Sequence, residues 1–349
     1  MSIEKKYRIS VCIPTYNRGE YIEELLNSFY IQPLALECQV VISDNASTDN
    51  TDIIVSSFIG KYDNIIYIKN KNNIGADLNY LQVVSNSSAE YCWLMGSDDI
   101  LLPQSLYEIN KIIEKNKGIT GISVNQLYMS KDLKCIPSVP PLFKTKSKDL
   151  TIYKNFEEIS IELGFYFGYL SGQIVNRHYW NEIISQGNYK PFLNAYVHVY
   201  IILSIIKVKP YWIFDPVQRV GYRSGNDSFL NNDALNRLLI DVNGYSKIYQ
   251  NFFKANKKTL SKCQSAIIIK YIRGHVIEAK LNNASAGFFL RVFMSTYLLY
   301  YKILKYWTHL MPFIILPVKI IKIIKYLYRR FLRKKYTIDN YAENLDIKK

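Results

Sequence analysis

Short apolar, β-branched runs alternate with stretches of helical periodicity along the first third of the chain. The strand-like runs lie at residues 9–13, 39–42, 65–68 and 91–95. Apolar residues at helical spacing predict helices between these runs, over residues 20–31, 49–58 and 76–84. Buried strands that alternate with helices indicate an α/β fold with a mostly parallel sheet and right-handed crossovers. Ligands bind such sheets beyond the carboxyl ends of the strands.

The pattern is mixed from about residue 119 to 230 and mainly helical from residue 232 onward. The middle part contains a loop rich in proline and lysine, and strand-like runs at residues 122–129, 172–176, 211–214 and 217–222. We therefore expect a first domain over residues 1–230, with halves at about 1–118 and 119–230. A helical subdomain over 231–285 and a C-terminal group of helices over 286–349 would follow it.

Positive charge is concentrated near the C-terminus. The 349 residues include 44 Lys and Arg against 29 Asp and Glu, for a net charge of +15, and residues 279–338 contain twelve of these cations and no Asp or Glu. The same segment is strongly apolar, but its longest uncharged stretches have ten and thirteen residues, whereas a spanning helix needs about 20. We therefore expect no transmembrane helix. The apolar fraction of 49% excludes a disordered chain.

The end of this segment has the pattern of a helix that lies in a lipid headgroup layer. Five of its cations fall within an arc of about 120° on a helix drawn at 100° per residue: Lys319, Lys322, Lys325, Arg329 and Arg333. A basic arc beside an apolar face favours an anionic membrane surface as a partner of residues 286–335. Two alternatives stay open, solvated cations on a helical subdomain and a homo-oligomer in which these helices pair with their copies. Nucleic acid is not expected as a partner, because no recognisable reading motif accompanies the basic residues.

The cysteines indicate a reducing compartment. They are odd in number and form no CxxC pair, which gives no disulfide framework and no zinc site: Cys12, Cys38, Cys92, Cys135 and Cys263. The first residues, MSIEKKYRIS, lack the apolar segment of a secretory signal. We expect a cytoplasmic protein, peripheral on the inner face of the cell membrane.

Polar clusters follow the first two strands, at the edge where a ligand would bind. The first strand runs into residues 14–18, PTYNR, and the second into residues 43–49, SDNASTD. A carboxylate at a strand end, such as Asp44, can accept an N–H from a nucleobase. Asp49 is better explained as the cap of the following helix.

The third and fourth strands also end in polar residues. Residues 70–76, NKNNIGA, place Gly75 at the start of a helix, where free amides can face phosphate or ribose oxygens. The fourth strand runs directly into Asp98 and Asp99. Adjacent carboxylates repel unless a cation neutralises them, and such hard oxygen ligands suit Mg²⁺ or Mn²⁺ together with substrate phosphates. The alternative is a turn in which both carboxylates face water.

These clusters, in this order, resemble the inverting glycosyltransferases of family 2. The matching segments are VCIPTYNR, VVISDNASTDNT, NKNNIGADLNY and WLMGSDDIL, within about residues 7–110. Beyond them, YLSGQIVNR and DPVQRVGYRSGNDS resemble the acceptor half of the family. The chain looks most similar to bacterial enzymes that extend O-antigen or similar surface oligosaccharides, the abequosyltransferase-like group. The resemblance implies the GT-A-type nucleotide-diphospho-sugar fold, with a helical C-terminal extension in this chain.

The resemblance also implies roles for individual residues. Asp44 would hold the nucleobase, and uridine and thymidine diphosphates are favoured because they carry an imide. Asp99 would be the main ligand of Mn²⁺ or Mg²⁺, with Asp98 beside it. In the implied reaction an acceptor hydroxyl attacks the anomeric carbon with inversion, while the metal neutralises the departing nucleoside diphosphate. The residues expected around the donor are Pro14, Thr15, Asn17, Asp44, Asn73, Gly75, Asp98 and Arg223.

Two features implied by the resemblance are missing. The general base would be an Asp or Glu at the start of a helix in the acceptor half, but residues 194–200, NAYVHVY, contain no carboxylate. His198 is the titratable candidate there with an ordinary pKa near neutrality. Two alternatives stay open: His198 is a packed structural histidine, or another residue such as Asp215 or Asp227 is the base. Relatives also carry a histidine about two residues after the arginine, where this chain has residues 225–226, GN.

The sequence thus predicts a metal-dependent glycosyltransferase. It would move a hexosyl or deoxyhexosyl group from a nucleotide-diphospho-sugar to a lipid-linked saccharide during bacterial surface polysaccharide assembly. The alternatives are a nucleotidyltransferase and a non-catalytic nucleotide-sugar-binding protein. The first normally has a Gly-rich basic loop after the first strand, whereas this chain has PTYNRGE. The second would account for the missing carboxylate base.

Overall fold

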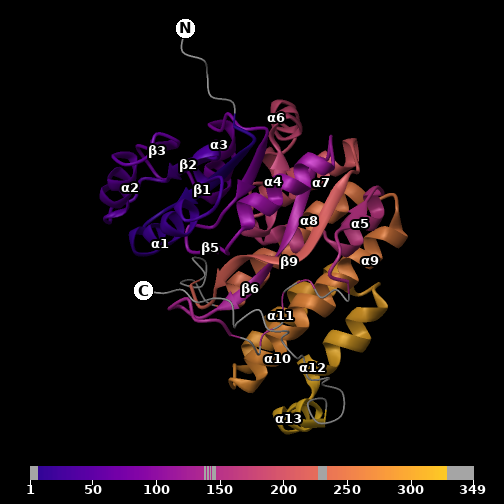
Figure 1. Ribbon diagram of the computed structural model, residues 1–349. Helices are drawn as coiled ribbons and strands as arrows, with labels where there is room; N and C mark the ends of the chain where they lie inside the picture. Colours follow the sequence, from indigo (N-terminus) through magenta and orange to yellow (C-terminus); the bar gives the residue numbers. More distant parts are fainter. Residues whose placement is uncertain are drawn as a thin grey trace. The chain divides into compact units, whose positions relative to one another are not determined.

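The computed structural model describes residues 7–136, 139, 141, 143, 147–226 and 234–327 (Figure 1). The chain divides into two compact units. Unit 1 contains residues 1–159 and 166–226, and unit 2 contains residues 160–165 and 227–349. The predicted boundaries near residues 230 and 285 remain predictions. Several predicted features lie outside the described residues: most of the loop at 137–148, Asp227, Arg329 and Arg333.

The sheet of unit 1 begins with four parallel strands, as the sequence predicts, in the order β3–β2–β1–β4. β1 (Ile9–Thr15), β2 (Gln39–Asp44) and β4 (Tyr91–Leu94) are buried along their whole length, which accounts for their continuous apolar runs. β3 (Ile65–Lys69) is partly exposed. The register pairs Thr15 with Asp44, so the polar residues that end β1 and β2 are neighbours.

Helices follow each of these strands. α1 (Gly19–Tyr30), α2 (Thr51–Ile59) and α3 (Ala76–Ser85) lie within two residues of their predicted bounds. α4 (Ser105–Lys115) follows β4, after the short strand β5 (Ile100–Leu101). α3 packs on β1 and β2, and α1 packs on α2 and β5. The sheet shares one apolar core with α1, α2 and α4.

The second half of the sheet is mixed in direction. β8 is antiparallel to both β4 and β6, β6 is parallel to β9, and β5 and β7 are both antiparallel to β9. The strands of this half are β6 (Gly121–Met129), β7 (Thr151–Tyr153), β8 (Gln173–Asn176) and β9 (Trp212–Arg223). The helices are α5 (Phe156–Glu162), α6 (Arg177–Ser185) and α7 (Val197–Val208), with short 3₁₀ turns η2 (Tyr166–Gly168) and η3 (Leu170–Gly172) before β8.

β9 corrects one expectation, because the runs predicted at 211–214 and 217–222 form a single strand of 12 residues. The strand continues through Asp215, which pairs with Val124 of β6, and then through Pro216 and Val217, which have no partner in β6 because the strand bulges there. The Asp215 carboxylate holds the bulge: it accepts hydrogen bonds from the Val217 amide at 2.9 Å and from Arg219 Nε at 2.7 Å. Proline is tolerated at such a position, since no ladder hydrogen bond is lost.

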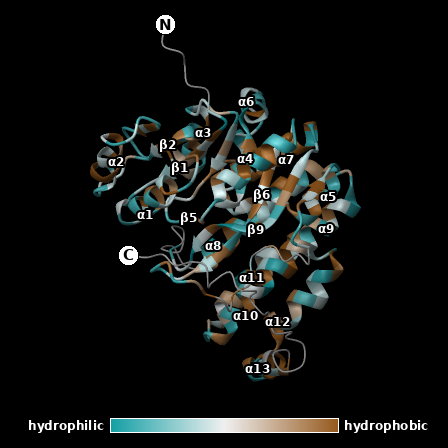
Figure 2. Ribbon diagram, viewed as in Figure 1, coloured by the Kyte–Doolittle hydropathy of each residue, from teal (hydrophilic) through white to brown (hydrophobic). Residues whose placement is uncertain are grey.

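Unit 2 is helical where it is described, as the sequence predicts. Buried tyrosines lie in its core, and Tyr300 OH and Ser246 Oγ are 2.7 Å apart. Apolar residues, brown in Figure 2, occur along several of its helices, and some of them are exposed, such as Leu290 and Ile323. No helix in the described part of the chain combines the length and the apolar character needed to cross a membrane. The helices are α8 (Ala234–Phe253), α9 (Lys257–Ile267), α10 (Arg273–Leu281), α11 (Ala286–Tyr300), α12 (Met311–Ile315) and α13 (Val318–Leu327), with π-helical turns at Ile268–Ile272 and Tyr306–Leu310.

Candidate active site

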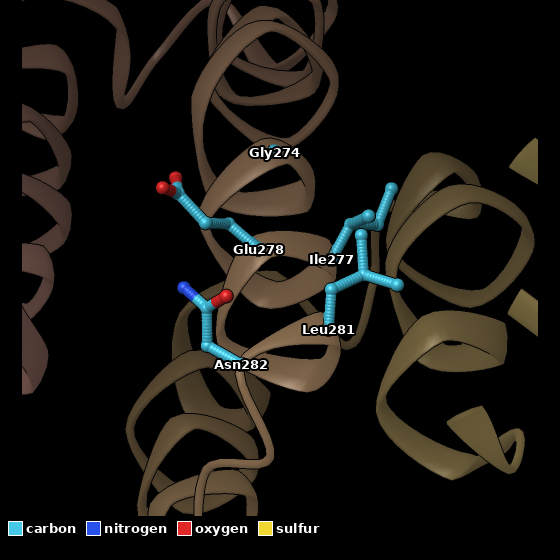
Figure 3. Close-up of a pocket in the computed structure, with 5 residues that line it drawn as sticks. All are labelled: Gly274, Ile277, Glu278, Leu281 and Asn282. Atoms are coloured by element: carbon cyan, nitrogen blue, oxygen red, sulfur yellow. The ribbon is translucent and has the colours of Figure 1, made fainter. Parts of the chain in front are cut away.

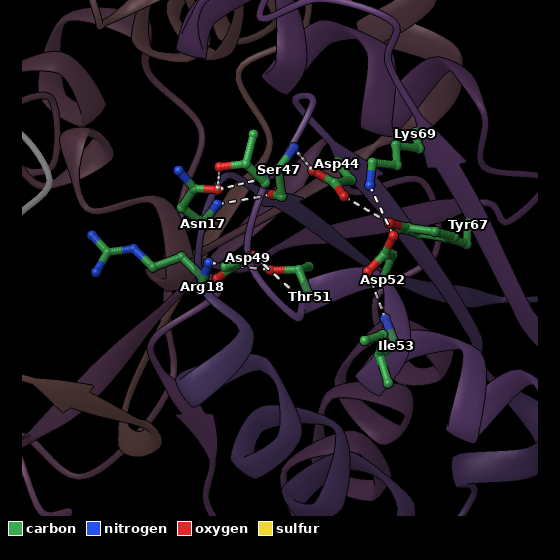
Figure 4. A network of polar contacts seen from close by, with 11 residues as sticks. Asn17, Arg18, Asp44, Ser47, Asp49, Thr51, Asp52, Ile53, Tyr67 and Lys69 are labelled. Carbon is green, nitrogen blue, oxygen red and sulfur yellow. Dashed lines mark hydrogen bonds and ion pairs between the residues drawn. The ribbon is translucent and has the colours of Figure 1, made fainter.

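The loops that follow β1 and β2 are locked to each other at the carboxyl edge of the sheet (Figure 4). The Asn17 amide donates to Ser47 Oγ at 2.8 Å, and the Thr48 amide donates to Asn17 Oδ1 at 2.8 Å. Asn17 has φ of 51° and Ala46 has φ of 65°, in the left-handed region that most residues avoid. Both loops are therefore held in conformations that would not form without these contacts, which is common where a backbone borders a ligand.

Asp49 caps two helices at once. Its Oδ2 accepts the amide of Gly19, the first residue of α1, at 2.9 Å, and its Oδ1 accepts the amide of Thr51, the first residue of α2, at 3.1 Å. These hydrogen bonds lower the pKa of Asp49 despite some desolvation, which raises it. The capping role predicted for Asp49 is confirmed.

Asp44 ends β2 as a fully buried carboxylate. Oδ1 accepts the Ser47 amide at 2.8 Å and Oδ2 accepts the Tyr67 hydroxyl at 2.6 Å, and burial together with this bond raises the pKa of Tyr67. Thr15, paired with Asp44, is 2% exposed, and its hydroxyl has no hydrogen-bond partner within the described residues. A buried hydroxyl without a partner beside a fixed carboxylate suggests that a ligand completes this edge.

Asn73 and Gly75 form the loop that leads into α3. Asn73 Oδ1 accepts the Gly75 amide at 2.9 Å and Asn45 Nδ2 at 2.8 Å, while Asn45 Oδ1 accepts the Ile74 amide at 2.8 Å. Gly75 has φ of 85°, which only glycine adopts without strain. The amides of residues 74 and 75, expected to be free for a ligand, are thus already bound by side chains.

Asp99 is the most enclosed carboxylate of the site. It is 4% exposed, and Tyr169 OH and Ser171 Oγ donate to its Oδ2 at 2.9 and 2.6 Å. The Arg223 amide donates to Oδ1 at 3.0 Å. Burial raises the pKa of Asp99, and the charge of the adjacent Asp98 raises it further, against these three donors.

Asp98 is less enclosed. Asn226 Nδ2 donates to its Oδ2 at 3.1 Å, and burial raises the pKa of Asp98 while the charges of Arg18 and Arg223 lower it. Arg18 NH1 in turn donates to Asn226 Oδ1 at 2.7 Å. Asn226, near the position where the family resemblance implies a histidine, therefore links the loop after β1 to Asp98.

The adjacent carboxylates fit a divalent cation bound partly by substrate. In the residues that the structure describes, no group of three His, Cys, Asp or Glu could hold a metal alone. Two carboxylates with raised pKa values would nevertheless be stabilised by a cation, and Mg²⁺ typically uses one or two carboxylates plus substrate phosphates. Since the oxygens of Asp99 are already bound by three protein donors, Asp98 is the better placed of the two to contact a metal.

Arg223, predicted to bind the diphosphate, is 3% exposed and bound on all sides. Its Nε donates to the Asp98 carbonyl at 2.8 Å, NH1 donates to the Lys131 carbonyl and NH2 pairs with Glu24. The guanidinium also lies 4.8 Å from the centre of the Tyr21 ring. Its donors therefore hold the segment that carries the two aspartates.

His198, the predicted base, lies in the first turn of α7 and is 2% exposed. Its ring packs edge-on against Tyr80, with centres 5.4 Å apart, and burial lowers its pKa to about 4. These features match the alternative of a packed histidine. Asp215, the alternative base, is 1% exposed, and its carboxylate is hydrogen-bonded within the bulge of β9.

The described part of the chain also has two surface hollows. One, of about 420 Å³, lies along α10 and is lined by Glu278, an amide and aliphatic groups (Figure 3). The other, of about 190 Å³, lies beside Arg223 and is lined by Glu20, Glu24 and Lys131 among others. The second hollow adjoins the Asp98 segment and belongs to the same edge of the sheet.

Solved structures with a similar fold are glycosyltransferases that bind nucleotides. S. aureus TarS, solved in complex with UDP-GlcNAc, matches with a TM-score of 0.56 and 14% identity over 81% of this chain and 80% of that chain. Mannosyltransferase PcManGT from Pyrobaculum calidifontis, solved in complex with GDP-Man and Mn²⁺, matches with a TM-score of 0.53 and 14% identity over 93% of this chain and 88% of that chain. The fold is therefore that of the GT-A glycosyltransferases.

Sequence comparison defines the family. The model of glycosyl transferase family 2 matches residues 10–167. Abequosyltransferase RfbV of Salmonella typhimurium is 34% identical over 259 residues, which span 71% of this chain and 76% of that protein. The chain belongs to glycosyltransferase family 2.

Sequence reasoning missed the residues that position the predicted ones. Tyr169 and Ser171 bind Asp99 from more than 60 residues away, although they lie within YLSGQIVNR, which resembles the family. Tyr67 binds Asp44 from the next strand, where a partly buried tyrosine has no distinguishing pattern. Only Tyr169 and Ser171 could have been found from the sequence, because they lie in a segment that resembles the family.

The burial of Arg223 generates a prediction about stability. Arg223→Lys should lower the free energy of unfolding by about 2 kcal/mol or more, because one ammonium cannot serve two carbonyls and a carboxylate. Glu24→Gln, at a side chain that is 45% exposed, should change it by about 0.5 kcal/mol or less. Urea unfolding measures both. If Arg223→Lys were as stable as the parent but bound nucleoside diphosphate more weakly, the arginine would be a ligand group instead.

Proposed function

We propose that this glycosyltransferase transfers a sugar with inversion from a nucleotide-diphospho-sugar to a saccharide acceptor. The observation that carries the proposal is the adjacent pair of the half-buried Asp98 and the buried Asp99 in the segment after β4, a strand that pairs with β1, which in turn pairs with β2. Solved proteins of this fold bind UDP-GlcNAc or GDP-Man, which supports a donor of the same class.

Asp98 would hold a divalent cation, Mn²⁺ or Mg²⁺, together with the donor diphosphate. Asp99 would keep Asp98 in place through its bonds to Tyr169, Ser171 and Arg223. When bound, the cation would neutralise charge that develops on the departing nucleoside diphosphate. The resemblance implies Asp99 as the main metal ligand, and we propose Asp98 instead because Asp99 is the more enclosed of the two.

The nucleoside would lie between the loops after β1, β2 and β3. The free hydroxyl of Thr15 and the fixed carboxylate of Asp44 would face the nucleobase, with Pro14 beneath them and Asn17 shaping the loop. Asn73 and Gly75 would border the ribose. A carboxylate acceptor favours the imide N–H of uracil or thymine, so UDP or dTDP sugars are the proposed donors.

A thermal-shift series tests the donor and the metal. UDP or dTDP should raise the melting temperature more than CDP or GDP, and Mn²⁺ should increase the shift, since ligand at 100 times its Kd stabilises by about 2.7 kcal/mol. Asp98→Asn should remove the part of the shift in melting temperature that depends on Mn²⁺. Asp52→Asn, a surface carboxylate paired with Lys69, is the matched control and should leave it intact.

Failure of all four nucleotides to shift the melting temperature would contradict the proposed donor class. If Mn²⁺ increased the thermal shift of Asp98→Asn as much as that of the parent, only the metal assignment would be contradicted.

The acceptor would be a lipid-linked saccharide in surface polysaccharide or O-antigen assembly. The relative named abequosyltransferase supports transfer of a deoxyhexose in such a pathway. The helices of unit 2 support a membrane-anchored acceptor. On α11, Leu290, Met294 and Leu298 form a stripe at helical spacing and are 61%, 61% and 77% exposed.

α13 combines the same exposed apolar groups with cations. Ile320, Ile323 and Ile324 are 41%, 58% and 39% exposed, and Lys319 and Lys322 are exposed beside them. Apolar groups of this kind with adjacent cations suit the interface of an anionic bilayer. Docking would place the enzyme beside a lipid-linked acceptor.

Vesicle flotation tests this docking. The full chain should float with vesicles that contain anionic lipid, and the double variant Lys319→Glu/Lys322→Glu should bind at least tenfold less, because each cation contributes about 1 kcal/mol. Lys257→Glu/Lys258→Glu on α9 makes the same change in net charge at exposed positions and should bind nearly as well as the parent.

An equal loss in both double variants would mean that net charge alone drives binding. If the parent chain did not bind vesicles but formed a dimer in solution, the helices would pair with their copies instead.

A further inference from the structure

A carboxylate lies at the start of α7 even though residues 194–200 contain none. It is the side chain of Asp77, from α3. Asp77 Oδ2 accepts the Ala195 amide at 2.7 Å, and Oδ1 accepts the Val197 amide at 3.0 Å. The contact joins the donor half to the acceptor half across more than 100 residues of sequence.

The backbone at this contact is strained. Ala195 has φ of 76°, in the left-handed region, where a side chain costs about 1 kcal/mol or more. The bond from its amide to Asp77 holds it there. On the other side, Asp77 is two residues from Gly75, whose φ of 85° sets the loop that would border the donor ribose. Both flanking segments are thus fixed in orientation around one carboxylate.

The surroundings suit a group that accepts a proton. Asp77 is half-buried, and this burial raises its pKa above the usual range, against the two amides, which lower it. The N-terminus of α7, like the two amides, favours the ionised carboxylate, which is the form in which a base must start. Tyr80, one turn further along α3, packs against His198, so α3 presents Asp77 to the start of α7 and encloses the histidine.

We infer that Asp77 is the general base of the transfer reaction that we propose above. Asp77 takes the proton of the acceptor hydroxyl while the acceptor oxygen forms its bond to the anomeric carbon. The bond between that carbon and the diphosphate oxygen breaks, and its electron pair leaves with the nucleoside diphosphate. The proton then passes to water. The carboxylate missing from α7 is supplied in space by α3.

The alternative is that Asp77 only caps α7, and two variants separate the roles. Serine cannot act as a base at neutral pH, and its shorter side chain does not bridge the amides of Ala195 and Val197, so Asp77→Ser loses both the base and most of the contact with α7. Asp77→Asn retains one oxygen acceptor and the shape of the side chain. As a control, Asn256→Ala removes the cap of α9, where Asn256 accepts the Thr259 amide at 3.1 Å.

The assay measures nucleoside diphosphate released from UDP-, dTDP-, CDP- and GDP-hexoses by the full chain with Mn²⁺, with water or a soluble saccharide as acceptor. Both Asp77 variants should lower kcat by 10²-fold or more, the order expected for loss of a general base, with the donor KM changed by less than about threefold. Sodium formate should restore part of the activity of Asp77→Ser, because a small carboxylate can enter the vacated space. Asn256→Ala should retain its kcat.

A capping role would give the opposite result. Asp77→Asn would then keep kcat within about threefold of the parent, or both variants would lose activity only in proportion to their folded fraction and without response to formate. Either result overturns the inference and leaves the proposed function intact. A parent chain that binds and cleaves none of the four donors overturns the proposed function, and the inference with it.

Discussion

The buried carboxylate of Asp99 is the constraint on which the candidate active site depends. An ionised carboxylate in the protein interior is stable only when donors surround it. The donors to Asp99 come from two segments that are distant from it in sequence: Tyr169 and Ser171 precede β8, and Arg223 ends β9. Hydrogen bonds to a charged group are worth about 1.5–3 kcal/mol each, so these contacts hold three parts of the sheet at one point.

The contacts around Asp99 determine which side-chain groups are still available to bind a ligand. The Arg223 guanidinium is bound to the backbone at Asp98 and Lys131 and to Glu24, which fixes the segment but leaves few donors for a diphosphate. Asp98 is less enclosed and lies beside Asn226. The positive charge that a diphosphate needs would then come mainly from a bound cation, which explains why two carboxylates with raised pKa values are adjacent here.

The parts of this fold that the sequence predicts are those with local signals. β1 to β4 and α1 to α3 have continuous apolar runs or clear periodicity, and Asp98 and Asp99 follow a strand in a recognisable segment. β9 was predicted as two strands because Asp215 and Pro216 look like a break; a bulge opposite β6 absorbs them. The partner of α7 could not be predicted, because Asp77 meets Ala195 only once the two halves have folded together.

We propose that Asp98, held in place by Asp99, binds a divalent cation together with the donor diphosphate. The most direct measurement is a crystal structure of the full chain with UDP and Mn²⁺, with anomalous data collected at the manganese edge. The account predicts an anomalous peak between the Asp98 carboxylate and the diphosphate, with Asp99 still bound to Tyr169 and Ser171. A nucleotide bound elsewhere, or a manganese peak distant from both aspartates, would contradict it.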